Sequence, residues 1–358
     1  MEYIALKNIC KINMGQSPDS SSYNDNKDGI PFFQGNADFG EKYPVTRVWC
    51  NAPIKVAQPN DILISVRAPI GALNFAKEEC CIGRGLAALT PDRSKVSLEF
   101  IYWVLKWKKA ELNSKGTGST FKAISRKVLE ETLVPAIDFE KQYEYAEILG
   151  KTYSVIKKYK KELNCLDGLI KARFVEMFGD PVSNSYGFPE ATLPELGELG
   201  RGVSKHRPRN DSKLLGGDYP LIQTGDVANA GLYITSYGGT YSELGLKQSK
   251  MWNKGTLCIT IAANIAKTAI LEFDACFPDS VVGFIANEKT NNIFIHYWFS
   301  FFQAILESQA PESAQKNINL KILSELKVIV PKKEKQDEFV EFIEQVYKSK
   351  VTVQKAFE

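Results

Sequence analysis

The chain repeats itself, and this internal duplication constrains the fold more than any other feature of the sequence. The stretch DILISVRAPIGALNF from Asp61 resembles TLCITIAANIAKTAI from Thr256, and GIPFFQ ending at Gln34 resembles GDYPLIQ ending at Gln223. The offset is 189 residues at the two glutamines and 195 residues at Asp61, a drift that loop insertions explain. Further matches follow in the same order, so the sequence predicts two copies of one domain.

Each copy is predicted to mix strands and helices. Asp61–Val66 and Thr256–Ile261 are short runs rich in isoleucine, leucine and threonine, which is typical of strands. Phe100–Leu112 has apolar residues at helical spacing and predicts a short helix. Pro135 and Pro331 close the two copies, because proline ends regular pairing.

A different kind of segment follows each copy. Glu140–Phe178 contains no proline, and its apolar residues recur every seven positions between charged ones. That spacing predicts a long helix that packs against another helix, and a glycine and a proline just after Phe178 end it. Glu334–Glu358 shows the same pattern more briefly. The residues expected to form the packed seams are Leu149, Ile156, Leu163, Ile170 and Met177 in the first helix and Phe339, Ile343, Val346 and Val353 in the second.

A single stripe of this kind is equally typical of an ordinary amphipathic core helix. Two stripes at equivalent places in a duplicated chain favour pairing with each other, and the chain must turn back for them to meet. The predicted fold class is therefore α+β, with two duplicated mixed α/β globules separated by two long antiparallel coiled-coil-like helices in a pseudo-twofold arrangement. The expected segments are 1–138 and 181–332 for the globules, 139–180 for the central helix and 333–358 for the C-terminal helix. Duplex DNA is the obvious extended, pseudo-twofold ligand for such a chain.

The composition is that of a folded protein of 358 residues, with 44% apolar and 24% charged residues. The net charge of +3 neither supports nor excludes nucleic acid, because it hides clustering. No apolar run approaches the ~20 residues that span a bilayer, and no signal peptide is evident. Seven cysteines without a C-x-x-C and only two histidines, His206 and His296, make a zinc site unfavourable. We expect reduced, mostly buried thiols, a cytoplasmic location and no membrane contact.

Catalytic signatures are missing from the sequence. It has no G-x-x-x-x-G-K-[ST] loop, no H-E-x-x-H and no G-x-S-x-G. It also has no Pro-Pro dipeptide, which removes the N-P-P-Y type motif of adenine methyltransferases. The adjacent carboxylates of Glu78-Glu79 and Glu130-Glu131 lie among lysines and favour solvated faces over an acid–base pair. We therefore expect neither a catalytic residue nor a metal site.

Binding features are richer, above all in the loop KGTGSTFK from Lys115 to Lys122. Its backbone N–H groups and small hydroxyls suit phosphate oxygens, and its lysines supply positive charge. The matching loop of the second copy, PESAQKN ending at Asn317, offers amides that suit an adenine edge. Any one of these residues alone is more simply explained as solvated surface, whereas the set favours DNA. The candidate DNA contacts are Arg67, Arg84, Lys115, Thr117, Ser119, Thr120 and Lys122 in the first copy and Lys205, Arg207, Arg209, Lys267, Ser313, Gln315, Lys316 and Asn317 in the second.

In order and twice over, these motifs resemble the DNA-specificity (S) subunits of type I restriction-modification enzymes. GQSP from Gly15, IPFFQGNAD, DILISVRAPIG, IGRGLAAL, GTGSTFKAIS and KVLEETLVP carry the likeness in the first copy. PLIQTGDV, ITIAANIAKTAIL and NINLKILSEL repeat it in the second, and FVEMFGDP from Phe174 ends the central helix. The likeness covers the whole chain.

The resemblance implies two target recognition domains, each reading one half of a split, asymmetric DNA site. It implies that the two helices fix the gap between the halves and dock two methyltransferase (M) subunits. This chain would then be noncatalytic and bind no cofactor, because S-adenosylmethionine and N6-adenine methylation belong to the M subunits. ATP and Mg²⁺ would be used by restriction (R) subunits, which join through the complex.

The chain departs from the family pattern in small ways. It begins almost directly in the first domain, and its final helix is shorter than the central one. Ala266 stands where the first copy has Gly71, so the two turns are expected to differ. Two alternatives from other classes stay open, a duplicated adaptor that organises proteins without touching DNA and an enzyme with an unrecognised site. Polar and basic side chains at equivalent loops of both copies favour DNA, whereas exposed aromatic residues there would favour the adaptor.

Overall fold

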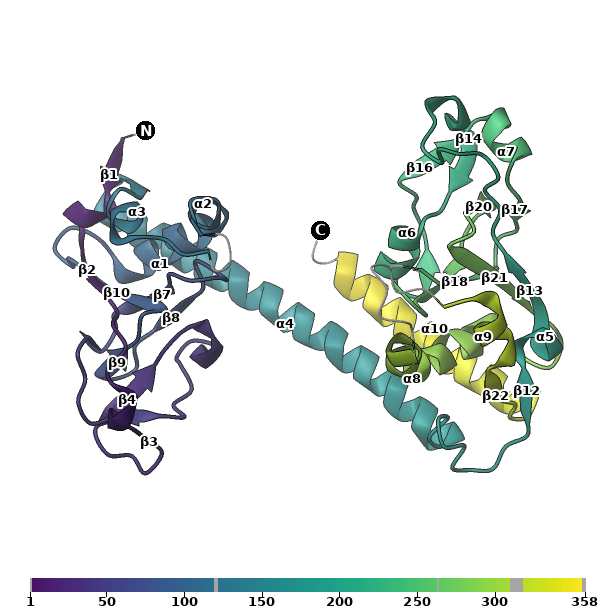
Figure 1. The fold of residues 1–358 in the computed structure, drawn as a ribbon, viewed down its shortest axis with the longest axis horizontal. Coiled ribbons are helices and arrows are strands. Elements are labelled where there is room, and N and C mark those ends of the chain that lie inside the picture. Colours follow the sequence, from purple (N-terminus) through teal and green to yellow (C-terminus); the bar gives the residue numbers. More distant parts are fainter. Residues whose placement is uncertain (1, 119–121, 263, 310–317, 356–358) are drawn as a thin grey trace. The chain divides into compact units, whose positions relative to one another are not determined.

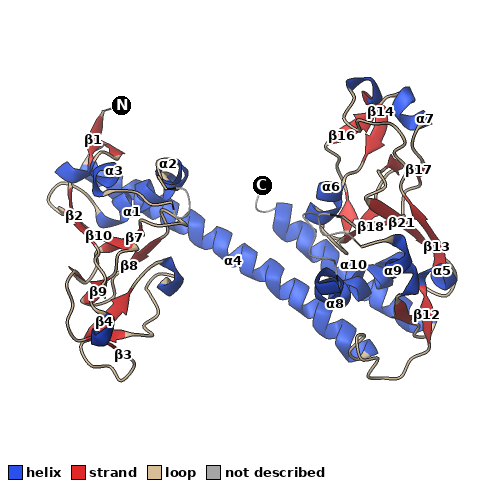
Figure 2. Cartoon of the chain, viewed as in Figure 1, coloured by secondary structure: helices blue, strands red, loops and turns tan. Residues whose placement is uncertain are grey.

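The chain divides into two compact units, Met1–Lys157 (unit 1) and Lys158–Glu358 (unit 2), in the computed structural model (Figure 1). The structure describes residues 2–118, 122–262, 264–309 and 318–355. One helix, α4 (Phe139–Phe178), runs through the boundary between the units. Both units mix helices and strands, as the sequence predicts (Figure 2).

The elements of unit 1 build two larger sheets and a strand pair. The strands are β1 (Tyr3–Ala5), β2 (Cys10–Met14), β3 (Tyr23–Asn24), β4 (Ile30–Phe33), β5 (Trp49–Cys50), β6 (Val56–Ala57), β7 (Ile62–Ser65), β8 (Leu73–Phe75), β9 (Cys80–Ile82), β10 (Leu86–Pro91) and β11 (Leu133–Pro135), and the α-helices before α4 are α1 (Leu98–Trp107), α2 (Lys109–Ser114) and α3 (Arg126–Glu130). Among these residues the sheet orders are β2-β10-β7-β8, β3-β5-β4-β9-β6 and β1-β11. β10 is antiparallel to β2 and β7, whereas β4 is parallel to β9.

The core of unit 1 lies between α1 and the four-stranded sheet. Ile101 and Leu105 of α1 are fully buried in one cluster with Ile62 and Ile64 of β7. The single helix expected over Phe100–Leu112 is instead two helices, because the chain leaves helical geometry at Lys108 (φ −78°, ψ 3°). That turn buries the Lys108 stem and brings its Nζ within 2.6 Å of the Glu111 carboxylate.

Unit 2 repeats this plan. Its strands are β12 (Glu190–Thr192), β13 (Gly197–Arg201), β14 (Leu215–Leu221), β15 (Tyr233–Ile234), β16 (Gly239–Tyr241), β17 (Met251–Trp252), β18 (Leu257–Thr260), β19 (Thr268–Leu271), β20 (Ala275–Cys276), β21 (Val281–Ala286) and β22 (Lys327–Ile329), and its further α-helices are α5 (Leu193–Leu196), α6 (Thr224–Asn229), α7 (Glu243–Lys247), α8 (Asn292–Gln309), α9 (Leu320–Glu325) and α10 (Lys333–Lys355). β21 is antiparallel to β13 and β18, as β10 is to β2 and β7. β14 is parallel to β20, as β4 is to β9. The predicted duplication is therefore confirmed at the level of strand pairing.

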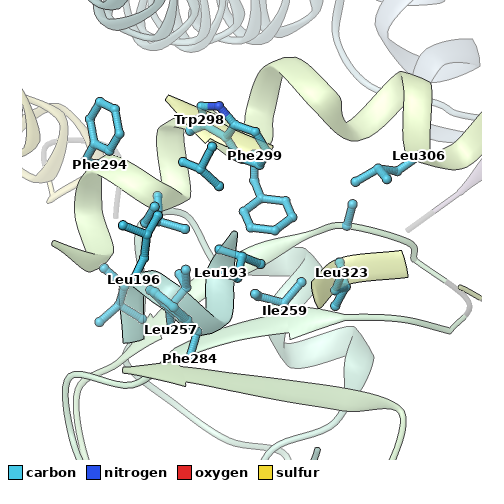
Figure 3. Close-up of a cluster of buried hydrophobic side chains, with 14 of the residues drawn as sticks. Leu193, Leu196, Leu257, Ile259, Phe284, Phe294, Trp298, Phe299, Leu306 and Leu323 are labelled. Carbon is cyan, nitrogen blue, oxygen red and sulfur yellow. The ribbon is translucent and has the colours of Figure 1, made fainter. Parts of the chain in front are cut away.

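Helix α8 supplies the large side chains of the unit 2 core (Figure 3). Phe294, Trp298 and Phe299 are fully buried against Leu257 of β18 and Phe284 of β21. The same cluster extends to the end of α4 and to α10. Apolar burial of this kind, at about 25 cal/mol per Å², is the main stabilising contribution to such a unit.

Helices α4 and α10 pack against each other within unit 2. Arg173 of α4 contacts Glu338 (2.9 Å), and Asp167, one and a half turns earlier, contacts Lys350 further along α10 (2.7 Å). Because the contacts run in opposite order along the two helices, α4 and α10 are antiparallel, as the sequence predicts. α10 is described to Lys355, so the expected helical residues 356–358 lie outside the described part.

The packed face of α4 differs from the predicted seven-residue seam. Its fully buried residues are Phe174 and Phe178, four residues apart, which the seam omits. A 3.6-residue helical turn brings this pair onto the same face as Ile170, and all three join Phe339 in the core. Leu149, by contrast, is 44% exposed. The remaining seam residues are half-buried (Ile156, Leu163 and Met177) or buried (Ile343, Val346 and Val353).

The cysteines are free thiols, and six of the seven are buried, with Cys165 exposed. This confirms the expectation of mostly buried, reduced thiols. Burial raises the pKa of Cys80 to about 12, helped by the nearby carboxylate of Asp61, and raises the pKa of Cys10 to about 12 as well. None of the helices described is long and apolar enough to cross a membrane.

Candidate nucleic-acid interface

The ends of neighbouring strands meet at one edge of the four-stranded sheet of unit 1. The N–H of Gly15, after β2, donates to the Leu86 carbonyl (2.9 Å), and the N–H of Val66, after β7, donates to the Gly85 carbonyl (2.9 Å). A side chain on Gly15 would not fit, because its Cβ would lie 2.2 Å from the Gly83 carbonyl oxygen. Close backbone approach therefore fixes these segments without help from side chains.

Two further segments join this edge through their main chains. The N–H of Gly85 donates to the carbonyl of Gln34, which follows β4 (3.1 Å). On the other side the N–H of Ala68 donates to the carbonyl of Lys122 (3.0 Å). Five loops of unit 1, each following or preceding a strand or helix, are thus tied into one hydrogen-bonded network (network 1).

Network 1 brings together three of the predicted cations. Arg67, Arg84 and Lys122 are exposed and lie beside residues that make its bonds. Lys115 is also exposed, but its ammonium group pairs with Glu111 at 2.6 Å, so its charge is partly offset. Guanidinium and ammonium groups on fixed loops can contact phosphates or guanine edges.

The same network recurs in unit 2 (network 2). The N–H of Gly202, after β13, donates to Val281 (2.9 Å), and the N–H of Ile261, after β18, donates to Ser280 (3.0 Å). The N–H of Ile318 donates to the Ile261 carbonyl (2.9 Å). In unit 1 the N–H of Ile124 donates in the same way to the Val66 carbonyl (2.9 Å). Main-chain geometry is therefore shared by the two copies at this edge.

The matched bonds align corresponding positions of the two networks. Arg67 corresponds to Ala262, and Arg84 corresponds to Asp279. Unit 2 thus lacks a basic side chain at the first position and has the opposite charge at the second. The two units share the main-chain hydrogen bonds of this frame, but the side chains at the matched positions differ.

Arginines reach network 2 from a different loop. Arg207 and Arg209 both form ion pairs with Asp279, the first at 3.4 Å. Arg207 also donates to the carbonyl of Ser204 (2.6 Å), and Lys205 is exposed beside it. The predicted basic residues of this loop are therefore brought together, with a carboxylate that orients their planar groups.

Lys267 is the other predicted cation of unit 2, and it is half-buried at the turn between β18 and β19. The preceding Ala266 has φ 57° and donates its N–H to Thr260 (2.9 Å), just as Gly71 has φ 83° and donates to Ser65 (2.9 Å). The two turns therefore agree at this position, and the expected difference lies earlier in the turn, where the Ala68–Pro69 peptide bond of unit 1 is cis. Alanine is small enough to take the left-handed conformation that glycine adopts freely.

The glycine-rich loop and its counterpart are described only in part. Thr117 is exposed, and its backbone pairs with Ala123 through hydrogen bonds of 3.0 and 2.9 Å. The other loop candidates, Ser119, Thr120, Ser313, Gln315, Lys316 and Asn317, lie outside the described residues.

Sequence reasoning missed three residues at these networks. Gln34 and Gln223 are exposed at the ends of β4 and β14, and the repeat match that ends on both glutamines was the signal for them. Gln223 also lines a cavity of about 330 Å³ beside Arg209 and Ala262. Asp279 carried no sequence signal, because only the fold brings it to the arginines.

The part of α4 that belongs to unit 1 exposes apolar and aromatic side chains. Tyr143 is 51% and Ile148 52% exposed. Beside this stretch lies a cavity of about 550 Å³ with Tyr102 and Tyr153 in its wall. The ammonium group of Lys106 lies 3.4 Å from the centre of the Tyr153 ring. Aromatic residues of unit 1 therefore gather along this helix.

Nothing in the described ranges groups three or more His, Cys, Asp or Glu side chains so that they could hold a metal ion. His206 is exposed beside Asp211 (3.1 Å), and His296 accepts or donates a hydrogen bond with Thr268 (2.9 Å). What the two networks offer chemically is hydrogen bonding and positive charge.

Two copies of one fold, each presenting polar loops on a shared frame, define a class of duplicated recognition proteins. The family model described as Type I restriction modification DNA specificity domain matches residues 1–165 and 190–356. The chain belongs to this family, and the two matched ranges follow the two copies that the repeat predicts.

Individual relatives agree with this assignment. The chain is 44% identical over 152 residues to the putative type I restriction enzyme MjaX specificity subunit of Methanocaldococcus jannaschii, a match covering 42% of this chain and 36% of that protein. It is 22% identical over 381 residues to the type I restriction enzyme EcoBI specificity subunit of Escherichia coli, covering 96% of this chain and 78% of that one. The crystal structure of a type I restriction-modification S subunit from M. genitalium has a similar fold, with a TM-score of 0.61, 16% identity, and coverage of 99% and 91% of the two chains.

Proposed function

We propose that this chain is the noncatalytic DNA-recognition subunit of a type I restriction-modification complex. It reads a bipartite, asymmetric site, with one recognition domain for each half-site. The observation that carries the proposal is the recurrence of one main-chain network in both units with different side chains at matched positions, as at Arg84 and Asp279. A common frame docks each domain on DNA in the same manner, and the differing side chains select different bases.

The chemistry of methylation and cleavage belongs to partner subunits in this proposal. Two M subunits use S-adenosylmethionine to methylate adenine, and R subunits use ATP and Mg²⁺, while this chain binds no cofactor itself. The polar and basic character of the network loops suits recognition.

The exposed apolar face of α4 in unit 1 supports a docking role for that helix. Tyr143, Ile148 and Val155 each leave about half of their surface in solvent, which is a surface that a protein partner would bury. We propose that an M subunit covers it. The adaptor alternative would need exposed aromatic residues at the network loops, where the described exposed side chains include arginine, lysine and glutamine.

The test is to express the chain with the M subunits of its own system and to map modified adenines by sequencing. We expect a split motif that appears only when this chain is present. Methylation of the same motif without the chain would contradict the proposal. Methyl transfer by the purified chain alone, with S-adenosylmethionine and DNA, would contradict its noncatalytic role.

Exchange of one domain tests whether each reads its own half-site. Replacing residues 1–138 by the first domain of another family member should change one half of the methylated motif and leave the other half intact. A change in both halves would contradict independent reading by the two domains.

A further inference from the structure

Gln34 and Gln223 occupy the same place in the two units. Each stands two residues after the strand residue that pairs in parallel with a cysteine, Phe32 with Cys81 in unit 1 and Leu221 with Cys276 in unit 2. The glutamine therefore follows the strand at the same position relative to the parallel pairing in both units. The two residues are also the last identical pair of the repeat match at these strands.

A carboxylate fixes the backbone of both glutamines. The N–H of Gln34 donates to Asp38 (2.8 Å), and the N–H of Gln223 donates to Asp226 (2.7 Å). In unit 1 the Gln34 carbonyl also accepts the N–H of Gly85. Both main chains are thus held in place by hydrogen bonds, which lowers the entropy lost when the side chain binds.

The carboxamides themselves are exposed. Within the described residues, the Gln34 carboxamide has no hydrogen-bond partner. Gln223 opens on the cavity of about 330 Å³ that Arg209, Ala262 and Ser280 also line. Ala262 and Ser280 are the unit 2 counterparts of Arg67 and Gly85, so both glutamines stand beside the corresponding loops of their networks.

A carboxamide presents one acceptor and two donor hydrogens in one plane. The major-groove edge of adenine presents N7 as an acceptor and the N6 amino group as a donor, which a glutamine can bond with both of its functions. Neither the neighbouring arginines nor lysines can accept from N6, because they carry donors only. Gln34 and Gln223 therefore offer each network a group that suits adenine.

We propose that Gln34 and Gln223 each read one A·T base pair in the half-site of their own domain, through the major-groove edge of adenine. This inference rests on the proposed function, and it assigns base recognition to two residues that the loop chemistry alone did not single out. The side chains at the matched positions Arg84 and Asp279 differ, so the half-sites share this A·T contact and differ around it.

The experiment uses the full chain assembled with its M subunits, and it compares Gln34→Ala, Gln223→Ala and a matched control. Gln58 provides the control, because it is exposed and its N–H donates to Asp61 (2.8 Å) in the same manner. It precedes β7, whereas network 1 lies where β7 ends. Modified-base sequencing gives the methylated motif of each variant, and thermal unfolding gives its stability.

We expect Gln34→Ala to relax one A·T position in one half of the motif and Gln223→Ala to relax one in the other half. Selectivity for A·T at the affected position should fall about tenfold or more. Gln58→Ala should leave the motif unchanged, and all three variants should unfold within about 2 °C of the parent.

An unchanged motif in both glutamine variants, or a change confined to the same half, overturns the inference. If a variant loses methylation altogether, we measure how tightly the assembled complex binds two duplexes, the original one and one with that A·T pair replaced. The comparison shows whether the glutamine reads the base pair. Selective loss on the original duplex supports base reading, and equal loss on both overturns it. Failure of the proposed function would give a different result from failure of this inference. The motif would then be methylated even when the whole chain is removed.

Discussion

At the scale of single residues, the second network holds a negative charge where the first exposes a positive one. Asp279 takes the place of Arg84 and pairs with Arg207 and Arg209. These pairs are partly exposed, so they contribute little to stability, about 1 kcal/mol or less. Their effect is to orient two guanidinium groups and to reduce the net positive charge of this loop.

Asp279→Asn should therefore strengthen nonspecific DNA binding while weakening selectivity in one half-site. With one negative charge removed, the slope of log affinity against log salt should become steeper by about 1 in the assembled complex. Binding to random-sequence duplex at several salt concentrations measures this. Glu288→Gln, which changes the net charge equally at an exposed position after β21, is the control and should leave the slope nearly unchanged.

A histidine in unit 2 makes stability depend on pH. Burial lowers the pKa of His296 to about 4, and the positive charge of Lys350 acts in the same direction, while a hydrogen bond with the Thr268 backbone opposes both. The unfolded value is about 6.5, so between pH 6.5 and 4 the unfolded chain binds a proton that the folded chain does not. Stability that is present above pH 6.5 is lost as the pH falls through this window.

We expect this single group to remove about 2 to 3 kcal/mol of the free energy of unfolding between pH 7 and pH 4. The variant His296→Gln keeps a hydrogen-bonding group for Thr268 but does not titrate in this range. Urea unfolding of both proteins at the two pH values should show a smaller drop for the variant. Equal drops would contradict the assignment of this pH dependence to His296.

At the scale of elements, the C-terminal part of α4 is a core helix. Phe174 lies with its ring centre 5.5 Å from that of Phe294 on α8 and 5.4 Å from that of Phe339 on α10. One residue thus links three helices of unit 2. Leu149, on the same helix but in unit 1, is 44% exposed.

Phe174→Ala should lower the free energy of unfolding by about 3 to 5 kcal/mol, because it removes buried surface and leaves a cavity. Leu149→Ala on the same helix should change it by about 0.5 kcal/mol or less. Chemical denaturation of the two variants beside the parent gives both values. Similar losses for the two would show that the helix is packed evenly along its length.

The pattern of seven-residue spacing predicted the helices and their antiparallel pairing, but it did not locate the buried face. Apolar residues every seven positions mark a stripe, whereas burial also depends on what faces the stripe. Phe174 and Phe178 are buried because α8 presents its own aromatic side chains to them. The approach of α8 is a tertiary effect that has no local signal in the sequence of α4.

The candidate site, like the packing of α4, was predictable from the sequence only in part. Arg67, Arg84 and Lys122 were found by residue type in loops, because loops beside strand ends collect recognition residues. Gln34 could be found in the sequence only through the internal repeat. No feature of the sequence indicated that Asp279 belongs to the site. Which side chains share a network depends on hydrogen bonds between segments far apart in the chain, such as Ala68 with Lys122.

At the scale of the whole molecule, the continuous helix α4 connects the two units, and we propose that its length sets the gap between the half-sites. An insertion of seven residues after Lys160 keeps the apolar stripe in register and adds about 10 Å at ~1.5 Å per residue. The methylated motif should keep both half-sites and gain about three base pairs of gap, at ~3.4 Å of rise per pair.

Mapping of modified adenines measures that gap, and an unchanged gap with full activity would show that α4 does not determine it. Loss of activity in a folded protein would instead mean that the M subunits cannot follow the longer spacing. A four-residue insertion at the same place is the control, because it rotates the apolar stripe and should impair assembly without offering a new gap.

Backbone hydrogen bonds hold much of the loops of both networks, and the carboxylates of Asp38 and Asp226 add to them, which has a consequence for how recognition can change over time. Bonds such as that between Val66 and Gly85 are indifferent to the side chains beside them, so exchanging Arg67 or Arg84 leaves the frame intact. Exposed substitutions of this sort alter stability by about 0.5 kcal/mol or less. If each domain reads its own half-site, as we propose, a lineage carrying this chain can acquire new sequence preferences through few mutations, one half-site at a time, without passing through unstable intermediates.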